Sequence, residues 1–212
     1  MKPSLRVYLC GSIQKGSDDK RSSFWFDEDI RELREAADPV RFVLLNPADR
    51  SDDLSDVRAT FGRDLLQVFS SGVVIADARA KRGVGVGAEL LFAKSHRIPV
   101  VAIVPPNSHY HRSDVTLMGQ FVKSWVHPFI SELSDAVVAT VADAAHAAIA
   151  LANGGAIRGP ECFHDAMVHY LKTQSDREAD MVSLLVEEAG APARAIRVRE
   201  ALNERLSVSE GI

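Results

Sequence analysis

The chain has 212 residues, of which 46% are hydrophobic and 25% charged, which suffices for one sizeable core but not for two full ones. A formal net charge of −4 gives no general attraction to nucleic acid or to an anionic membrane surface, so we expect neither as a partner. Two cysteines cannot form a disulfide framework, the N-terminal apolar run is too short for a signal peptide, and no stretch approaches the roughly 20 apolar residues of a membrane span, so we expect a cytoplasmic protein.

Five short apolar runs are predicted to be strands. They are continuous rather than alternating, which is typical of strands buried on both faces of a sheet. In chain order they are 6–10, 41–45, 73–77, 99–104 and 136–140. Helical patterns separate them, at 26–37, 65–69, 89–96 and 141–153. Alternating strands and helices predict right-handed βαβ units, and therefore an α/β fold with a doubly wound, flavodoxin- or Rossmann-like, five-stranded parallel sheet.

The glycine-rich stretch 154–159 reads as a linker. We place one α/β domain at residues 1–155 and a helical appendage at residues 156–212. Pro160 suits a first helical turn, Ser175 and Glu178 form a capping-box pattern, and Gly190 suits a helix end before a further start at Pro192. The apolar positions of this appendage need a surface to bury against, either the α/β core or a second subunit.

Ligands of open parallel sheets bind at the carboxyl ends of the strands. The first predicted strand ends at Gly11, Ser12 and Ile13, and the third ends at Asp77. A short basic loop with Arg79, Lys81 and Arg82 follows the third strand. We expect these two strands to be neighbours at the switch point of the sheet, so their loops should face one crevice.

Three glycines, Gly83, Gly85 and Gly87, stand just before a predicted helix start at Glu89. They would let the backbone adopt positive φ angles and approach a ligand, while the helix would offer free N–H groups. Their G-x-G-x-G spacing after the third strand does not match the dinucleotide-binding pattern. Glu89 itself could be a catalytic carboxylate or simply a residue that the helix dipole favours.

Three blocks of sequence together carry a resemblance to a known family. They are 7–13 (VYLCGSI), 63–77 (RDLLQVFSSGVVIAD) and 83–101 (GVGVGAELLFAKSHRIPVV). In this order and spacing they resemble the nucleoside 2-deoxyribosyltransferase superfamily. The likeness covers about residues 5–105 and is greatest to the 2′-deoxynucleoside 5′-monophosphate N-glycosidases, which share the YxCGSI opening and the GVGxEL loop.

The resemblance implies a role for each matching residue. Glu89 would attack C1′ of the sugar and form a glycosyl-enzyme ester, Tyr8 would hold Glu89 in line, and Asp64 would protonate or orient the leaving base. The substrate would be bound by the loops after the first and third strands, with contributions from Gly11, Ser12, Ile13, Asp77, Gly83, Gly85 and Gly87. Such chemistry is consistent with an oxocarbenium-like transition state, which a carboxylate under C1′ stabilises or traps.

The sequence departs from that family at Gly83, where the N-glycosidases carry a phosphate-binding serine; Arg79, Lys81 or Arg82 could take over that function. His127 could complete the site, or it could simply be a surface or helix-end histidine. The resemblance also implies a homodimer, and we expect no metal ion and no other cofactor. A nucleoside or nucleoside 5′-monophosphate is the expected ligand.

Three functions remain open. The first is an N-glycosidase acting on a nucleoside or nucleotide, and the second is a deoxyribosyltransferase that passes the sugar to a free base. The third is a nucleotide-binding sensor without catalysis, a hypothesis motivated by Gly83 and by the additional helices. Cleavage of the nicotinamide bond of NAD is a further chemical variant of the first.

Overall fold

The computed structural model describes residues 3–11 and 25–186 of the chain. The predicted ligand residues Ser12 and Ile13 lie outside the described residues, as do the predicted helix end at Gly190 and helix start at Pro192. The chain divides into two compact units, Met1–Gly159 and Pro160–Ile212. The division falls at the end of the predicted linker.

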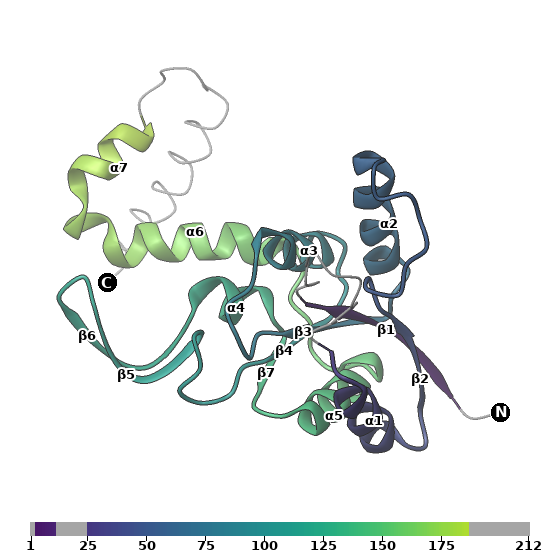
Figure 1. Cartoon of the computed structure of the whole chain (residues 1–212). Coiled ribbons are helices and arrows are strands. Elements are labelled where there is room, and N and C mark those ends of the chain that lie inside the picture. Colours follow the sequence, from purple (N-terminus) through teal and green to yellow (C-terminus); the bar gives the residue numbers. More distant parts are fainter. Residues whose placement is uncertain (1–2, 12–24, 187–212) are drawn as a thin grey trace. The chain divides into compact units, whose positions relative to one another are not determined.

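A five-stranded parallel sheet is the centre of the first unit, as the continuous apolar runs predict (Figure 1). Its strand order is β2-β1-β3-β4-β7. The strands are β1 (Ser4–Cys10), β2 (Arg41–Leu45), β3 (Val73–Asp77), β4 (Val100–Ile103) and β7 (Ala136–Val138). The chain leaves β1 toward β2 and later returns to the other side of β1 as β3, with Leu9 opposite Ile75 and Cys10 opposite Ala76. The predicted switch point between the first and third strands is therefore confirmed.

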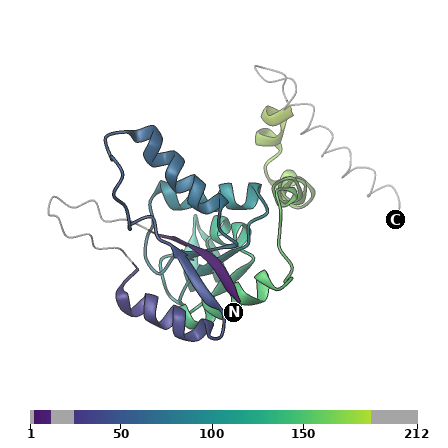
Figure 2. The same ribbon diagram turned by 90° about the vertical axis from the view of Figure 1, so that its right-hand side faces the viewer.

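Helices cover both faces of this sheet (Figures 1 and 2). One layer is formed by α1 (Asp27–Ala37) and α5 (Val141–Ala152), the other by α2 (Val57–Phe69) and α3 (Val84–Ser95). Val7 and Leu9 of β1 belong to the core beneath α1 and α5. Because side chains alternate along a strand, Tyr8 and Cys10 turn to the opposite face, where α3 packs. Both side chains are fully buried there.

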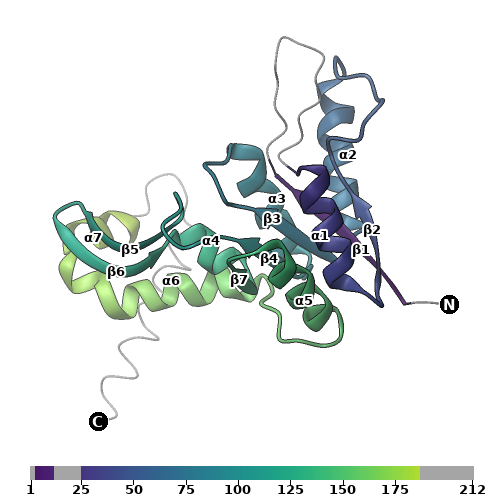
Figure 3. The same ribbon diagram turned by 60° about the horizontal axis from the view of Figure 1, so that its bottom comes forward.

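A β-hairpin lies between β4 and β7, in a stretch where the sequence predicted none of its five strands. It consists of β5 (His111–Leu117) and β6 (Gln120–Val126), followed by α4 (Pro128–Leu133), and Figure 3 shows it as a separate two-stranded ribbon. Met118 and Gly119 connect the strands with φ angles of 47° and 82°, as a two-residue turn of type I′ requires. His111 is the first residue of β5.

A buried ion pair joins the end of α3 to the start of β7. Nζ of Lys94 lies 2.6 Å from Oδ1 of Asp135, and both side chains are fully buried. The same carboxylate accepts hydrogen bonds from the backbone N–H groups of Val100 at 2.8 Å and Arg158 at 2.7 Å. The Asp135 carboxylate thus receives hydrogen bonds from three separate parts of the chain. These contacts offset the free-energy cost of burying its charge.

The second unit is helical in its described part, as predicted. It contains α6 (Glu161–Gln174), a 3₁₀ turn at Ser175–Arg177 and α7 (Ala179–Val186). Val168 and Leu171 are buried and pack against Tyr170 and Val182. The predicted capping box is not formed as such, because the Ser175 hydroxyl donates to the Leu171 carbonyl oxygen instead of capping α7. None of the helices in the described ranges combines the length and the apolarity that crossing a bilayer requires.

Candidate functional site

Glu89 lies in the second turn of α3, not at the helix start. The helix begins at Val84 with Gly83 as its N-cap residue, five residues earlier than the helix start predicted at Glu89. The dipole effect of a helix is confined to its first turn, so Glu89 has no strong stabilisation from it. Its carboxylate instead points at the end of β1, where Tyr8 and Cys10 lie.

One of the two predicted reasons for the three glycines, a positive φ angle, is wrong, because none of them has one. Gly83 is extended with φ −82°, and Gly85 and Gly87 are helical. A Cβ atom added at any of the three would meet nothing within 4 Å. Neither backbone conformation nor packing therefore requires glycine here, although glycine costs a helix interior about 1 kcal/mol relative to alanine. Bare backbone beside Glu89 is what a closely approaching ligand would need.

Burial sets the protonation of Glu89. Its Oε2 atom is buried, and desolvation is the largest influence in raising the pKa of this carboxyl group from 4.5 to about 7. The nearby charge of Asp64 adds to the increase, whereas Cys10 and Tyr8 lower the pKa. Glu89 is thus not simply a carboxylate that the helix dipole favours: close to neutral pH both of its protonation states are accessible, which suits a group that must gain and lose a bond or a proton.

Tyr8 and Cys10 flank the Glu89 carboxylate from β1. The Tyr8 hydroxyl is buried, and in the described part of the chain neither it nor Oε2 of Glu89 closes a hydrogen bond of normal geometry. Burial, followed by the charge of Glu89, raises the pKa of Tyr8 well above its ordinary value, so this side chain stays a neutral donor. Two unsatisfied buried polar groups facing each other are costly in a folded protein. Both groups could accept a hydrogen bond from a polar ligand or donate one to it.

Asp64 reaches the same site from α2. Its charge acts on both Glu89 and Tyr8, raising the pKa of each. Two guanidinium groups orient it: Nη1 of Arg63 lies 3.2 Å from Oδ1, and Nη1 of Arg50 lies 3.5 Å from Oδ2. The structure therefore brings together the three predicted catalytic residues, one from each of β1, α2 and α3.

Asp77, predicted to bind substrate, is engaged in protein contacts. Its side chain is 1% exposed and pairs with Arg82 and with Nε of Arg79 at 2.9 Å. Arg79 also forms a two-pronged pair with Asp29 of α1, at 2.7 and 2.8 Å. Two of the three basic residues considered for phosphate binding thus hold carboxylates of the protein itself, and of these three only Lys81 is exposed.

Gly11 closes the first strand against Trp25. A Cβ atom at Gly11 would lie 3.2 Å from Nε1 of Trp25, so packing accounts for glycine at this position. The Arg79 guanidinium lies 5.8 Å from the centre of the Trp25 ring, within the range of a cation–π contact. Trp25 and Asp29, which no sequence pattern marks, therefore lie beside the end of β1 and the segment that follows β3.

An aromatic cluster at the base of the hairpin lies beside the start of α3. The Tyr110 hydroxyl accepts a hydrogen bond of 2.9 Å from the backbone N–H of Arg82. The Tyr110 ring contacts His127, with 5.4 Å between ring centres, and His127 in turn contacts Trp125 and Phe129. His127 thus contacts Tyr110, and Tyr110 in turn binds the backbone directly before Gly83.

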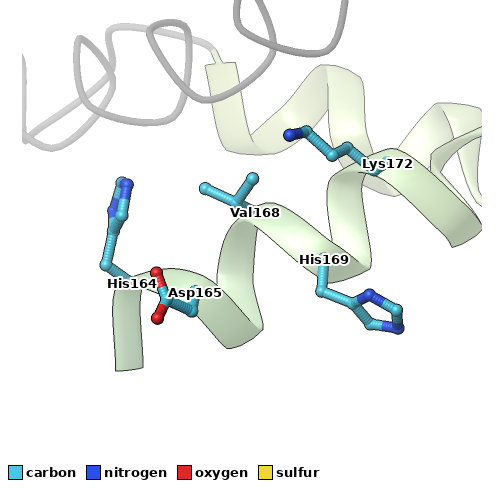
Figure 4. A pocket seen from close by; sticks show the side chains of 5 residues that line it. All are labelled: His164, Asp165, Val168, His169 and Lys172. Carbon is cyan, nitrogen blue, oxygen red and sulfur yellow. The ribbon is translucent and has the colours of Figure 1, made fainter. Parts of the chain in front are cut away.

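A shallow hollow on the second unit contains none of the predicted site residues (Figure 4). All of its lining side chains belong to α6: His164, Asp165, Val168, His169 and Lys172. Across residues 3–11 and 25–186, no group of three or more His, Cys, Asp or Glu side chains is placed to hold a metal ion.

The sequence matches no family model and no curated protein at a significant level. The basis for a functional assignment is therefore the three motif blocks of the sequence together with the geometry around Glu89.

The raised pKa of Glu89 predicts a pH-dependent cost to stability. A carboxyl group whose pKa rises on folding favours the folded state when protonated, and this advantage is lost as pH rises from about 4.5 through about 7. At 1.36 kcal/mol per pKa unit the loss amounts to roughly 3 kcal/mol. We expect Glu89→Gln to raise the free energy of unfolding by about that amount at pH 8 and to leave it unchanged at pH 4, as measured by urea titration.

The matched control is Glu35→Gln, because Glu35 is an exposed glutamate on α1. A surface change of this kind is expected to alter stability by less than about 0.5 kcal/mol at either pH. Equal stabilisation by Glu89→Gln at pH 4 and pH 8 would contradict the raised pKa.

Proposed function

We propose that the protein is an N-glycosidase of the nucleoside 2-deoxyribosyltransferase type, which cleaves the base–sugar bond of a nucleoside or nucleoside 5′-monophosphate. The observation that supports this best is the convergence of Glu89, Tyr8 and Asp64 at the carboxyl end of β1, beside bare helical backbone at Gly85 and Gly87. Two carboxylates of unlike surroundings are what glycosidic cleavage needs.

In this proposal the ionised Glu89 attacks C1′ as the bond to the base breaks, which gives a glycosyl ester and a free base. The electron pair of the broken bond leaves with the base, and a proton delivered to the base through Asp64 or water completes the leaving group. Tyr8, kept neutral by burial, donates a hydrogen bond to the carboxylate and aims it. Water then hydrolyses the ester and regenerates Glu89.

The same ester would serve a transferase, since only the acceptor differs. The two unsatisfied polar groups of Tyr8 and Glu89 favour catalysis over the non-catalytic sensor, because a pure binding protein does not need an acid with a raised pKa at this position.

The test is an assay of free base release. The purified full chain is incubated with ribo- and deoxyribonucleosides, their 5′-monophosphates and NAD, with and without a second free base, and the products are separated by chromatography. Base release without acceptor is the expected result. A new nucleoside formed only when a second base is present would assign a transferase. Nucleotide binding without turnover of any substrate would refute the enzyme and favour a sensor.

We also propose that the protein acts as a homodimer and that α2 lies in the interface. Val57, Phe61 and Phe69, spaced four and eight residues apart on α2, are all more than half exposed, and so is Leu66. Several large exposed apolar side chains on one helix are a common mark of a subunit interface. A second copy of the chain supplies an equally apolar face, as a twofold interface requires.

Phe61→Lys is expected to convert the dimer into a monomer, because it places a charge in the middle of this face. Size-exclusion chromatography with light scattering measures the result, and the circular dichroism spectrum should not change, since Phe61 is 61% exposed. Phe129→Lys is the control, as Phe129 is 72% exposed but lies on α4. A wild-type protein that is monomeric at every concentration would refute the proposal.

A further inference from the structure

Cys10 is a buried group at the site to which the proposed mechanism gives no part. It is the last residue of β1, is fully buried, and lies on the same face of the strand as Tyr8. Its Sγ atom is 4.0 Å from the carbonyl oxygen of Val86 in the first turn of α3. Cys10 thus spans the gap between the end of β1 and the helix that carries Glu89.

The thiol faces two acceptors and has one hydrogen to donate. One acceptor is the Val86 carbonyl oxygen, and the other is the Glu89 carboxylate, whose charged form the thiol favours. A hydrogen bond to an ionised acceptor is stronger than one to a neutral acceptor. A hydrogen bond from the thiol to Glu89 therefore favours the charged form of this carboxylate, and the contact with Val86 keeps the thiol beside α3.

Cys10 is unsuited to be a nucleophile itself. Burial, and after it the charge of Glu89, raises the pKa of the thiol well above its usual range. The reactive form of cysteine is the thiolate, which this environment suppresses. What remains is a compact neutral donor held at a fixed place.

Building on the proposed function, we infer that Cys10 is a positioning residue for Glu89, whose thiol holds the carboxylate at the end of β1 in its ionised, attacking form. Tyr8 stands beside it on the same strand and shares this task. The unsatisfied Tyr8 hydroxyl and the unsatisfied Oε2 of Glu89 mark the space that the sugar would enter. Cys10 differs from Tyr8 in that its thiol also contacts the backbone of α3, at the carbonyl oxygen of Val86.

The other charged groups at this place act in known directions. Asp64 of α2 raises the pKa of Glu89, and Asp77 at the end of β3 raises that of Cys10. Arg82, which follows β3, lowers the pKa of Cys10. Substitution of Cys10 leaves these three groups in place, so a change in the titration of Glu89 can be assigned to the thiol.

The first experiment compares the pH profiles of kcat/KM for wild type, Cys10→Ala and Cys10→Ser. Loss of the donor is expected to move the acid limb of the Cys10→Ala profile upward by roughly 0.5 to 1 pH unit, which lowers kcat/KM at pH 6 about 3- to 10-fold. Cys10→Ser keeps a donor and should restore the limb to the wild-type position. Cys162→Ala, at the other cysteine, should leave it unchanged. Coincident limbs for wild type and Cys10→Ala would overturn the inference.

A second measurement does not depend on activity. The free energy of unfolding is measured against pH for wild type, Cys10→Ala, Glu89→Gln and the double variant. The effect of Glu89→Gln on the free energy of unfolding, measured once in the wild type and once in Cys10→Ala, reports the titration of Glu89. The pH midpoint of this effect should be higher in the Cys10→Ala background. An unmoved midpoint would overturn the inference. If Cys10→Ala does not fold, Cys10→Val, which also lacks a donor, takes its place in both experiments.

The two experiments separate failure of the inference from failure of the proposed function. Absence of base release from every substrate would refute the glycosidase, while the stability measurement would still decide whether Cys10 governs Glu89. Base release that needs Glu89, together with pH profiles that ignore Cys10, would refute the inference alone.

Discussion

Glu89→Gln is expected to lower the rate of base release by about 10⁴- to 10⁶-fold, as removal of a nucleophile does in enzymes with covalent intermediates. Glutamine has nearly the same shape and keeps the fold, but its amide cannot form the glycosyl ester. The same substitution should stabilise the protein at pH 8, because it removes a buried carboxylate whose pKa is raised to about 7. Loss of activity through unfolding is thereby excluded within one variant.

Glu89→Ala extends the test to the covalent step. Removal of the side chain leaves a space beside Tyr8 and Cys10 into which azide can enter and attack C1′. We expect azide to restore base release in Glu89→Ala and to yield a glycosyl azide, identified by mass spectrometry, while the wild type does not respond. Retention of more than about a tenth of the wild-type rate by Glu89→Gln would contradict the nucleophile assignment.

Asp135→Ala is expected to lower the free energy of unfolding by about 3–5 kcal/mol, the range found when one partner of a buried ion pair is removed. The alanine leaves the Lys94 ammonium group buried without its carboxylate, and the backbone N–H groups of Val100 and Arg158 lose their acceptor. Urea titration at pH 7 measures the effect.

Two controls define the cause. Glu132→Ala removes an exposed carboxylate whose Oε2 atom lies 3.0 Å from Nη1 of Arg158. This change should lower the free energy of unfolding by no more than about 1 kcal/mol. Lys94→Met should cost less than Asp135→Ala, because the two backbone donors to Asp135 remain. A loss below about 1 kcal/mol in Asp135→Ala would show that the buried pair does not stabilise the fold.

The sheet could be predicted from the sequence because its physical signal is local and strong. Burial on both faces of a sheet favours a continuous apolar run, as in residues 73–76, where all four residues are buried ahead of the buried Asp77. Of the strand order, the sequence predicted the pairing of the first and third strands at the switch point, and this pairing is confirmed. The convergence of Tyr8, Asp64 and Glu89 could be predicted only from the family likeness, since their separations in the sequence carry no geometric information.

The start of α3 and the hairpin could not be predicted in the same way. Glycine is a poor helix former, so Gly85 and Gly87 made a helical segment look like a loop. The hairpin turn uses Met118 at a positive φ angle, where asparagine, aspartate or glycine would have been the recognisable signal. Its strands are largely exposed, and they therefore lack the apolar run that identified the others.

The partners of Asp77 were hidden for a different reason. Arg79 binds Asp29 across 50 positions of sequence, and no local pattern on α1 marks an aspartate that faces inward. An acidic residue in the first turn of a helix is common, so Asp29 had an ordinary explanation. Cys10 likewise stood in a strand where a small apolar side chain is unremarkable.

The open space around Gly85 and Gly87 has a consequence for anyone who wishes to make this protein more heat-resistant. Replacing helical glycines with alanine is a standard route to thermostability, worth about 0.4–1 kcal/mol each where the backbone allows it. Both positions satisfy that condition, since a Cβ atom would meet no neighbour within 4 Å. A selection for melting temperature alone would therefore favour alanine there and fill the space beside Glu89 with methyl groups. Selection for stability and selection for turnover would drive these two positions in opposite directions.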